Sequence, residues 1–344
     1  MQVRENIPLA PWTTFGIGGP ARWLVEAIGE EEVAEAACWA QGRAVPLFVL
    51  GGGSNVLVAD RGFDGLVLRM ALKGMAQHGE QFRAAAGEDW DGFVAMAVER
   101  GYQGVECLAG IPGTVGGTPV QNVGAYGQEV SSSIERVRAF DTVERVFVEF
   151  SNHECGFAYR SSRFNSVERG RYIVTRVDYR LKRGGAPLLG YADLKLHFRN
   201  RVDSPPLSEA AAAVRRIRQS KGMLLVEGES DCRSAGSFFK NPEVSAERAV
   251  QVRKLADGGG ISLRVYPSAE GMVKIPSAWL IEHAGFSRGY TRGAAAISTR
   301  HTLALVNRGG ATAAEIAALA GEIRDGVEAR FGIRLEMEPV CVGF

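Results

Sequence analysis

The sequence predicts an α+β fold from three stretches of the chain. Its first sixty residues give the order strand, helix, strand, and the helix begins with an acidic turn at Glu30–Glu32. Residues 173–181 alternate apolar and polar side chains, which is typical of a strand with one buried face. Residues 312–331 begin with a capping box and keep apolar positions at helical spacing. Since strands follow one another between residues 134 and 181, we expect separate helical and sheet regions rather than a doubly wound parallel sheet.

The other elements follow from apolar periodicity and from the residues that begin or end helices. Helix 90–100 ends at Gly101, and helix 208–221 follows a Pro-Pro linker at 203–206 with Ser208 as its expected N-cap. A final strand is expected over residues 334–343. The remaining predicted elements are strands at 22–25, 46–50, 56–58, 65–70 and 145–150 and the helix at 30–42.

Composition excludes several classes of protein. A chain of 344 residues is long enough for two or three domains, and its net charge of +1 argues against binding nucleic acid through a basic face. No apolar run approaches the about 18 residues of a membrane span, and the N-terminus lacks a signal peptide. We therefore expect a cytoplasmic protein with neither nucleic acid nor membrane as a partner. The five cysteines are scattered without a C-x-x-C pair, which indicates reduced thiols and no metal site.

A glycine-rich turn, Gly51-Gly52-Gly53-Ser54-Asn55, joins the strands at 46–50 and 56–58. Glycine allows positive φ and a close approach of main-chain N–H groups to a ligand. Successive N–H groups can form a nest for a phosphate or pyrophosphate, to which Ser54 and Asn55 add polar side chains. The turn matches neither the dinucleotide fingerprint nor the P-loop, and taken alone it is more often an ordinary turn.

Two further loops strengthen the functional interpretation. Residues 108–117 and 121–127 are also rich in glycine and other small residues. Small side chains cannot fill a core, so three such loops leave room for a large, flat ligand with a phosphate tail. A dinucleotide with a broad ring system fits that description.

Six motifs in order along the chain closely resemble the UDP-N-acetylenolpyruvoylglucosamine reductases, also called UDP-N-acetylmuramate dehydrogenases. The resemblance implies an FAD-binding fold of the vanillyl-alcohol-oxidase (PCMH) type in two subdomains and a separate α+β substrate-binding domain. The implied boundaries are residues 1–65 and 66–205 for the FAD subdomains, 206–320 for the substrate domain, and 321–344 for a segment returning to the flavin. The motifs are TTFGIGG (13–19), GGGSNVLV (51–58), AGIPGTVGG (109–117), QNVGAYG (121–127), YRSSRF (159–164) and SAGSFFKNP (234–242).

The resemblance also implies the cofactor and the reaction. NADPH would supply hydride to FAD, which would reduce the enolpyruvyl ether of UDP-GlcNAc in peptidoglycan precursor synthesis. The loops contain no His or Cys that the family would use to tether a flavin, so we expect FAD to be bound noncovalently. The resemblance also implies that the protein is a monomer. The expected cofactor-binding residues are Gly51, Gly52, Gly53, Ser54, Asn55, Pro112, Gly113, Gly124, Ala125 and Tyr126.

Three residues match the catalytic positions of the family. Arg160 would bind a carboxylate with its planar fork, and Ser237 would be the proton donor, with Lys240 as a hypothetical support for its alkoxide. The family's catalytic carboxylate is the second Glu of a Leu-Glu-x-Glu pattern, which here is Glu338. Because Pro339 replaces the aliphatic residue that usually follows, Glu336 stays a competitor for that role.

Six residues match positions for the substrate. The segment after Lys221 lacks a Leu-Pro-Asp sequence often found there and is longer before Ser237, and His301 stands where many relatives carry Gln. Both departures concern substrate contacts rather than the chemistry. The expected substrate-binding residues are Tyr191, which belongs to a subtype with a substrate-covering loop, and Lys221, Asn241, Tyr266, Lys274 and His301.

Two alternatives stay open at this point. One is an FAD-dependent oxidase of the same fold that acts on an alcohol or a sugar. The other is a non-catalytic sensor of UDP-sugars.

Overall fold

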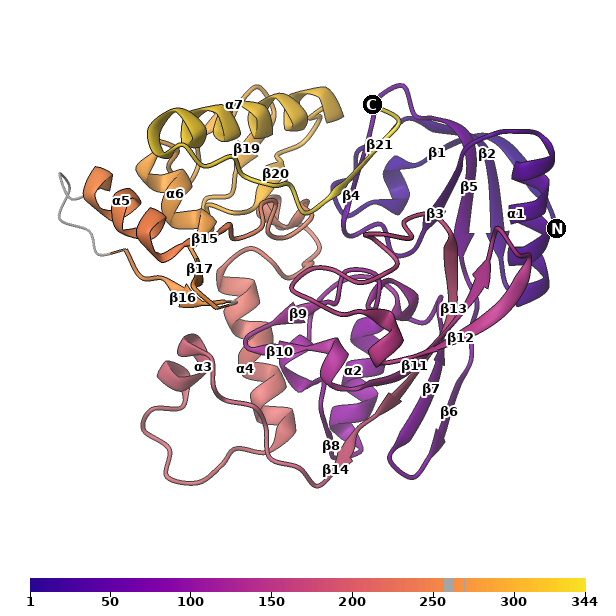
Figure 1. Ribbon diagram of the computed structural model, residues 1–344, viewed down its shortest axis with the longest axis horizontal. Helices are drawn as coiled ribbons and strands as arrows, with labels where there is room; N and C mark the ends of the chain where they lie inside the picture. The colour runs from indigo at the N-terminus through magenta and orange to yellow at the C-terminus, as the bar shows by residue number, and fades with distance from the viewer. Residues whose placement is uncertain (257–262, 269) are drawn as a thin grey trace. The chain divides into compact units, whose positions relative to one another are not determined.

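The computed structural model describes residues 1–256, 263–268 and 270–344 (Figure 1). Its contacts divide the chain into two compact units, and each is described by itself. The helix expected to begin the substrate-binding domain belongs to unit 1, and part of that expected domain, 257–262 and 269, lies outside the described residues. Unit 1 comprises Met1–Trp12, Pro20–Ser54 and Gly62–Ser220, and unit 2 comprises Thr13–Gly19, Asn55–Arg61 and Lys221–Phe344.

The first sheet of unit 1 contains the predicted β-α-β segment. Its strand order is β1-β2-β5-β3, in which β1 is antiparallel and the other three are parallel. Helix α1 (Glu30–Gly42) lies beside β2 and β5 (Figure 1) and buries Val33, Ala36 and Ala40 against them. The strands are β1 (Val3–Pro8), β2 (Pro20–Ala27), β5 (Phe63–Met70) and β3 (Leu47–Leu50).

The second sheet of unit 1 is antiparallel throughout, with the order β12-β11-β13-β7-β6. The alternating residues of β13 that were predicted to point inward, Ile173, Thr175, Val177 and Tyr179, are buried. Val174 is buried as well, because a register shift against β11 interrupts the alternation there. Helix α2 (Trp90–Glu99) packs Phe93 against Tyr179 with ring centroids 4.8 Å apart. The strands are β6 (Met75–His78), β7 (Gln81–Ala85), β11 (Ile134–Asp141), β12 (Val146–Ser151) and β13 (Tyr172–Arg180).

The predicted N-cap of the helix after the linker was wrong. Helix α4 runs over Leu207–Ser220, so Ser208 lies inside its first turn. The Pro206 carbonyl accepts hydrogen bonds from the N–H groups of Glu209 and Ala210 and thereby begins the helix one residue earlier. The smaller elements of unit 1 are β8 (Tyr102–Gln103) with β14 (Lys182–Arg183), β9 (Gly124–Ala125) with β10 (Gln128–Glu129), α3 (Ala192–His197), and short 3-10 turns at Ala10–Trp12, Glu106–Leu108, Val115–Gly117, Val130–Ser132 and His153–Cys155.

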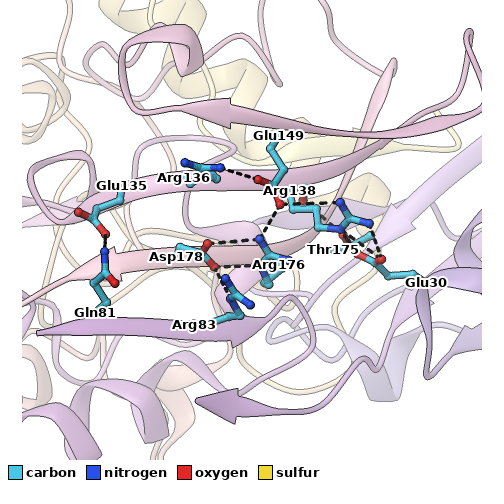
Figure 2. A network of polar contacts seen from close by, with 10 residues as sticks. All are labelled: Glu30, Gln81, Arg83, Glu135, Arg136, Arg138, Glu149, Thr175, Arg176 and Asp178. Carbon is cyan, nitrogen blue, oxygen red and sulfur yellow. Dashed lines mark hydrogen bonds and ion pairs between the residues drawn. The ribbon is translucent and has the colours of Figure 1, made fainter. Parts of the chain in front are cut away.

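A network of charged side chains joins α1 to the second sheet (Figure 2). The Glu30 carboxylate accepts hydrogen bonds from Arg138 Nε at 2.8 Å, from Arg138 Nη2 at 3.0 Å and from Thr175 Oγ1 at 2.6 Å. The network continues through Arg176, which donates to Glu149 at 2.7 Å and to Asp178 at 2.9 Å. Partial burial alone would raise the pKa of Glu30, but the bonds from Arg138 and Thr175 outweigh it and lower that pKa below its usual 4.5.

Glu30→Gln is expected to lower the free energy of unfolding at neutral pH by about 1 kcal/mol, because the pair is partly exposed and water screens it. A depressed carboxyl pKa stabilises the folded state above the unfolded pKa, and that contribution is lost as the pH falls toward the folded value. The gap between wild type and variant in urea unfolding should therefore close below about pH 4.5. Glu31→Gln, at an exposed site in the same turn, is the control. A gap that is constant down to pH 3 would contradict this assignment.

Unit 2 is built around the long helix α7 (Ala313–Phe331). The predicted capping box is confirmed, since Thr312 and Glu315 exchange both bonds, and the helix ends at Gly332 with φ 60°. Its apolar face, including Ile316, Leu319 and Ile323, is fully buried. The other elements are β4 (Val56–Val58), β15 (Glu243–Ser245), β16 (Tyr266–Pro267), β17 (Met272–Lys274), β18 (Thr291–Arg292), β19 (Ala295–Ile297), β20 (Leu305–Asn307), α5 (Ala246–Ala256), α6 (Ser277–His283) and a 3-10 turn at Ser230–Cys232.

The C-terminal segment is less regular than predicted. Only β21 (Val340–Val342) is a strand, which pairs in parallel with β4 (Figure 1), and Met337 forms an isolated bridge with Phe239. Pro339 lies between these two pairings, and proline has no N–H to continue a ladder. In the described ranges, no helix is long and apolar enough to cross a membrane, and no cluster of His, Cys, Asp and Glu side chains has a geometry suited to a metal ion.

Candidate active site

The glycine turn after β3 packs directly against the second glycine-rich loop. A Cβ on Gly52 would lie 2.6 Å from Gly113 Cα, and a Cβ on Gly51 would lie 2.8 Å from Thr114 Oγ1. Both residues are therefore required for the close approach of the two loops. We expected positive φ from these glycines, but of the three only Gly53, at 64°, has it.

The same turn presents main-chain donors. Within the described chain, no residue accepts a hydrogen bond from the N–H groups of Gly52, Gly53 or Ser54. Successive N–H groups without a protein acceptor are the donor set of an anion nest. The residues present thus fit a pyrophosphate, and its binding at this turn stays a prediction.

A buried arginine that sequence reasoning missed holds the second loop. Arg218 on α4 donates from Nε to the Gly110 carbonyl at 3.0 Å, while the Gly110 N–H donates to Asp91 Oδ1 at 2.7 Å. Burial lowers the pKa of Arg218. The helical spacing of Leu207, Ala211 and Val214 would have placed Arg218 on the buried face, so a signal was present.

Arg160 occupies a strained position beside the third loop. It lies in a tight turn closed by Ala158 and Ser161, whose main chains exchange bonds of 2.9 and 3.1 Å, and its φ of 53° is left-handed. Such a conformation costs on the order of 1 kcal/mol for a non-glycine residue and is characteristic of functional sites. Its Nη2 donates to the Gly124 carbonyl at 2.8 Å, which holds the guanidinium against the β9–β10 hairpin.

The β9–β10 hairpin also meets Tyr191. Its turn residues Tyr126 and Gly127 both have positive φ, which is the primed type of hairpin turn. The rings of Tyr126 and Tyr191 pack edge to face with centroids 5.4 Å apart. Tyr191 precedes α3 and is 39% exposed.

Ser237 and Glu338 come from adjacent antiparallel segments of unit 2. The Glu338 N–H donates to the carbonyl of Phe238, the residue after Ser237, at 2.9 Å. Asn55 donates from Nδ2 to the Glu338 carbonyl at 3.3 Å and accepts from the Val340 N–H at 2.9 Å. The structure therefore brings Ser237, Glu338 and Asn55 together.

The competing carboxylate has different surroundings. Glu336 has 71% of its side chain exposed and forms an ion pair with Lys240, with Nζ and Oε1 2.5 Å apart. Lys240, which was the hypothetical support for the Ser237 alkoxide, is therefore paired with Glu336. Glu338 is only partly exposed.

The other five residues expected to bind the substrate lie within unit 2. Tyr266 faces Lys274 across the β16–β17 pair, and Lys274 lies 3.3 Å from Glu243. Asn241 accepts the N–H of Ser277 at 2.9 Å, at the start of α6. Lys221 and His301 lie on segments joined through Asp231, a buried carboxylate that sequence reasoning also missed.

Two family models match the chain. Residues 21–146 match the FAD binding domain, and residues 228–342 match the UDP-N-acetylenolpyruvoylglucosamine reductase C-terminal domain. The predicted α+β, FAD-binding fold is confirmed, and the protein is an FAD-containing oxidoreductase. The glycine turn up to Ser54, the β9–β10 hairpin and Arg160 belong to unit 1, and the Ser237 and Glu338 segments belong to unit 2.

Curated relatives and a solved structure extend over the whole length. UDP-N-acetylenolpyruvoylglucosamine reductase of Streptomyces coelicolor is 45% identical, covering 100% of this chain and 91% of the relative. The reductase of Thermobifida fusca is 44% identical over 98% of each chain. The crystal structure of the Thermus caldophilus enzyme is similar with a TM-score of 0.68 and 28% identity over 99% of both chains. The chain belongs to the UDP-N-acetylenolpyruvoylglucosamine reductase family.

Proposed function

We propose that the chain catalyses the NADPH-dependent reduction of UDP-N-acetylglucosamine-enolpyruvate to UDP-N-acetylmuramate, a step in the synthesis of peptidoglycan precursors. The observation that carries the proposal is the pairing of the Ser237 segment with the Glu338 segment, through the Phe238 carbonyl, in a member of this family. A hydroxyl and a carboxyl from adjacent segments suit a reaction that adds a proton next to a carboxylate.

FAD would be held by the residues of the three loops. The Gly51–Asn55 turn would bind the pyrophosphate, and Pro112, Gly113, Gly124, Ala125 and Tyr126 would line the rest without a covalent bond. When bound, FAD supplies the hydride, taken from NADPH, that reaches the methylene carbon of the enolpyruvyl group.

The protein's own groups complete the addition. Hydride addition places a pair of electrons on the α-carbon and its carboxylate, and Ser237 supplies the proton that converts this carbon to CH. Arg160 binds the substrate carboxylate with its planar guanidinium group. Glu338, which is protonated or shares a proton, faces the negative charge that develops on the α-carbon and this carboxylate. Fixed groups of this kind are worth about a hundred- to a thousandfold in rate each.

The other end of the substrate is a uridine diphosphate. Lys221 and Lys274 provide cations for the diphosphate, and Asn241 and His301 provide hydrogen bonds. Tyr266 offers a flat face to a base or a sugar, and Tyr191 covers the bound substrate. The enzyme acts as a cytoplasmic monomer and serves cell-wall growth, cell shape and division.

The test is an anaerobic titration of the purified protein followed by its visible spectrum. The protein is expected to be yellow, to bleach with NADPH, and to regain its absorbance on addition of UDP-GlcNAc-enolpyruvate. Reoxidation by oxygen alone at a comparable rate would indicate an oxidase of the same fold. A protein that stays colourless when given FAD would indicate a non-catalytic sensor of UDP-sugars.

A further inference from the structure

One carboxylate in unit 2 is buried without an ion pair among the described residues. Asp231 is 3% exposed, and its Oδ2 accepts three hydrogen bonds, from Ser298 Oγ at 2.9 Å, Thr299 N at 2.8 Å and Thr299 Oγ1 at 2.6 Å. Burial alone would raise the pKa of Asp231, but these bonds lower it below its usual value, so the group is ionised at neutral pH. A buried charge is costly unless hydrogen bonds compensate it, and here they all come from one turn.

The bonds to Asp231 are relayed to His301. Ser298 Oγ, which donates to Asp231, also accepts the N–H groups of Arg300 at 3.0 Å and His301 at 3.3 Å. The turn between β19 and β20 is closed by Ser298 N to the Ala304 carbonyl at 2.8 Å. Asp231 therefore orients, through Ser298, the main chain that carries the His301 side chain.

The His301 ring has a defined tautomer. Its Nδ1 accepts the Leu303 N–H at 3.1 Å, so the neutral ring carries its proton on Nε2. Nε2 is then a hydrogen-bond donor, as the amide nitrogen of a glutamine would be. This chemistry accounts for a histidine at a position where many relatives carry Gln.

The Cβ of Asp231 lies close to the chain that follows Lys221. Gly222 has a φ of 66°, and a Cβ there would lie 3.3 Å from both Asp231 Cβ and Ser298 Oγ. A second tie joins the two segments, since Arg300 Nη1 and Glu229 Oε2 are 2.6 Å apart. The segment after Lys221 was expected to depart from the family pattern, and this packing gives that segment a role.

We propose that Asp231 is a positioning residue for the uridine-diphosphate end of the substrate. It fixes both the turn that presents the His301 Nε2–H donor and the main chain that carries Lys221. The inference rests on the proposed function, and it adds a residue that makes no contact with the reacting atoms.

Asp231→Asn removes the charge, so the three hydrogen bonds to the remaining amide oxygen are no longer charge-assisted. UDP alone is the binding probe, measured by calorimetry with the FAD-containing protein. The Kd for UDP and the KM for the enolpyruvyl substrate are expected to rise about tenfold, as for the loss of a charge-assisted hydrogen bond, with kcat within about threefold. His301→Gln is expected to keep UDP affinity within about threefold, and His301→Phe to lose about tenfold.

A double-mutant cycle separates positioning from general damage. If Asp231 acts through His301, the two losses in Asp231→Asn/His301→Phe will be far from additive. Asp64→Asn, at an exposed ion pair in unit 1, is the matched control and should leave UDP affinity unchanged. Should Asp231→Asn not fold, Ser298→Ala, which keeps the bonds to Thr299, is expected to weaken UDP binding about fivefold.

Two outcomes would overturn the role of Asp231 alone. One is wild-type affinity for UDP in a folded Asp231→Asn or Ser298→Ala protein, and the other is full additivity in the cycle. A wild-type protein that binds no UDP would contradict the proposed function and this role together. If the wild-type protein turns over the enolpyruvyl substrate and Asp231→Asn binds UDP with unchanged affinity, only the role of Asp231 is contradicted and the proposed function stands.

Discussion

Ser237→Ala is expected to leave reduction of the flavin by NADPH within about twofold of wild type, while its reoxidation by the enolpyruvyl substrate slows by about 10²- to 10⁴-fold, the usual contribution of a general acid. The two half-reactions differ because only the second one requires a proton at the α-carbon. Anaerobic stopped-flow measurements of flavin absorbance, with NADPH and substrate added in turn, separate the two rates.

The control for this variant is Ser287→Ala, at an exposed serine of the same unit. It should change neither rate. Equal slowing of both half-reactions in Ser237→Ala would instead assign Ser237 a structural role. The main-chain pairing of Phe238 with Glu338 does not involve the serine side chain, so the substitution should leave the fold intact.

Gly52→Ala is expected to yield a protein that has lost most of its FAD and unfolds at a lower temperature. The new Cβ would lie 2.6 Å from Gly113 Cα and 2.9 Å from the Gly113 carbonyl carbon, and neither is a flexible side-chain atom that can move aside. Forcing the two loops apart costs about 1–3 kcal/mol, which lowers FAD affinity by about fivefold to 150-fold. The measurements are flavin absorbance per protein after gel filtration, and thermal unfolding.

Gly117→Ala is the matched control, because a Cβ there meets no atom within 4 Å and the residue lies in the same glycine-rich loop as Gly113. It should retain FAD and its melting temperature. Full flavin content in Gly52→Ala would show that the loop contact is dispensable for the nest.

Periodicity and capping residues predicted the elements whose stability is local. The helix after Thr312 and the strand from Ile173 were recognisable because a capping box and an alternating pattern act within a few residues. The start of α4 was mispredicted because a proline carbonyl, rather than the expected serine hydroxyl, accepts the first helical N–H groups.

Long-range polar contacts were beyond the reach of sequence patterns. Asp231 is a charged residue in an irregular segment, and its partners lie 67 and 68 residues further along the chain. Nothing local distinguishes such an aspartate from a solvated one. Arg218 differs, because its helical position placed it on an apolar face where a charge requires an explanation.

The glycine motif shows how one pattern can serve two purposes. The sequence suggested that its glycines approach a ligand, and the N–H groups of residues 52–54 are consistent with that. Gly51 and Gly52 also allow another loop to approach, which no property of the turn itself indicates. The binding of a phosphate by this motif stays a prediction, and the packing of the two loops is a second reason for its glycines.

Asn55 follows directly on the glycine turn that we propose binds the pyrophosphate, and its side chain and carbonyl hold the main chain around Glu338. Thermodynamic linkage requires that any energy passed through this residue be the same in both directions. If an anion bound in the turn orders the segment that carries Glu338, it raises the affinity of that segment for its ligand. The ligand must then raise the affinity of the turn for the anion by the same factor. A single asparagine would then make cofactor retention and substrate occupancy cooperative.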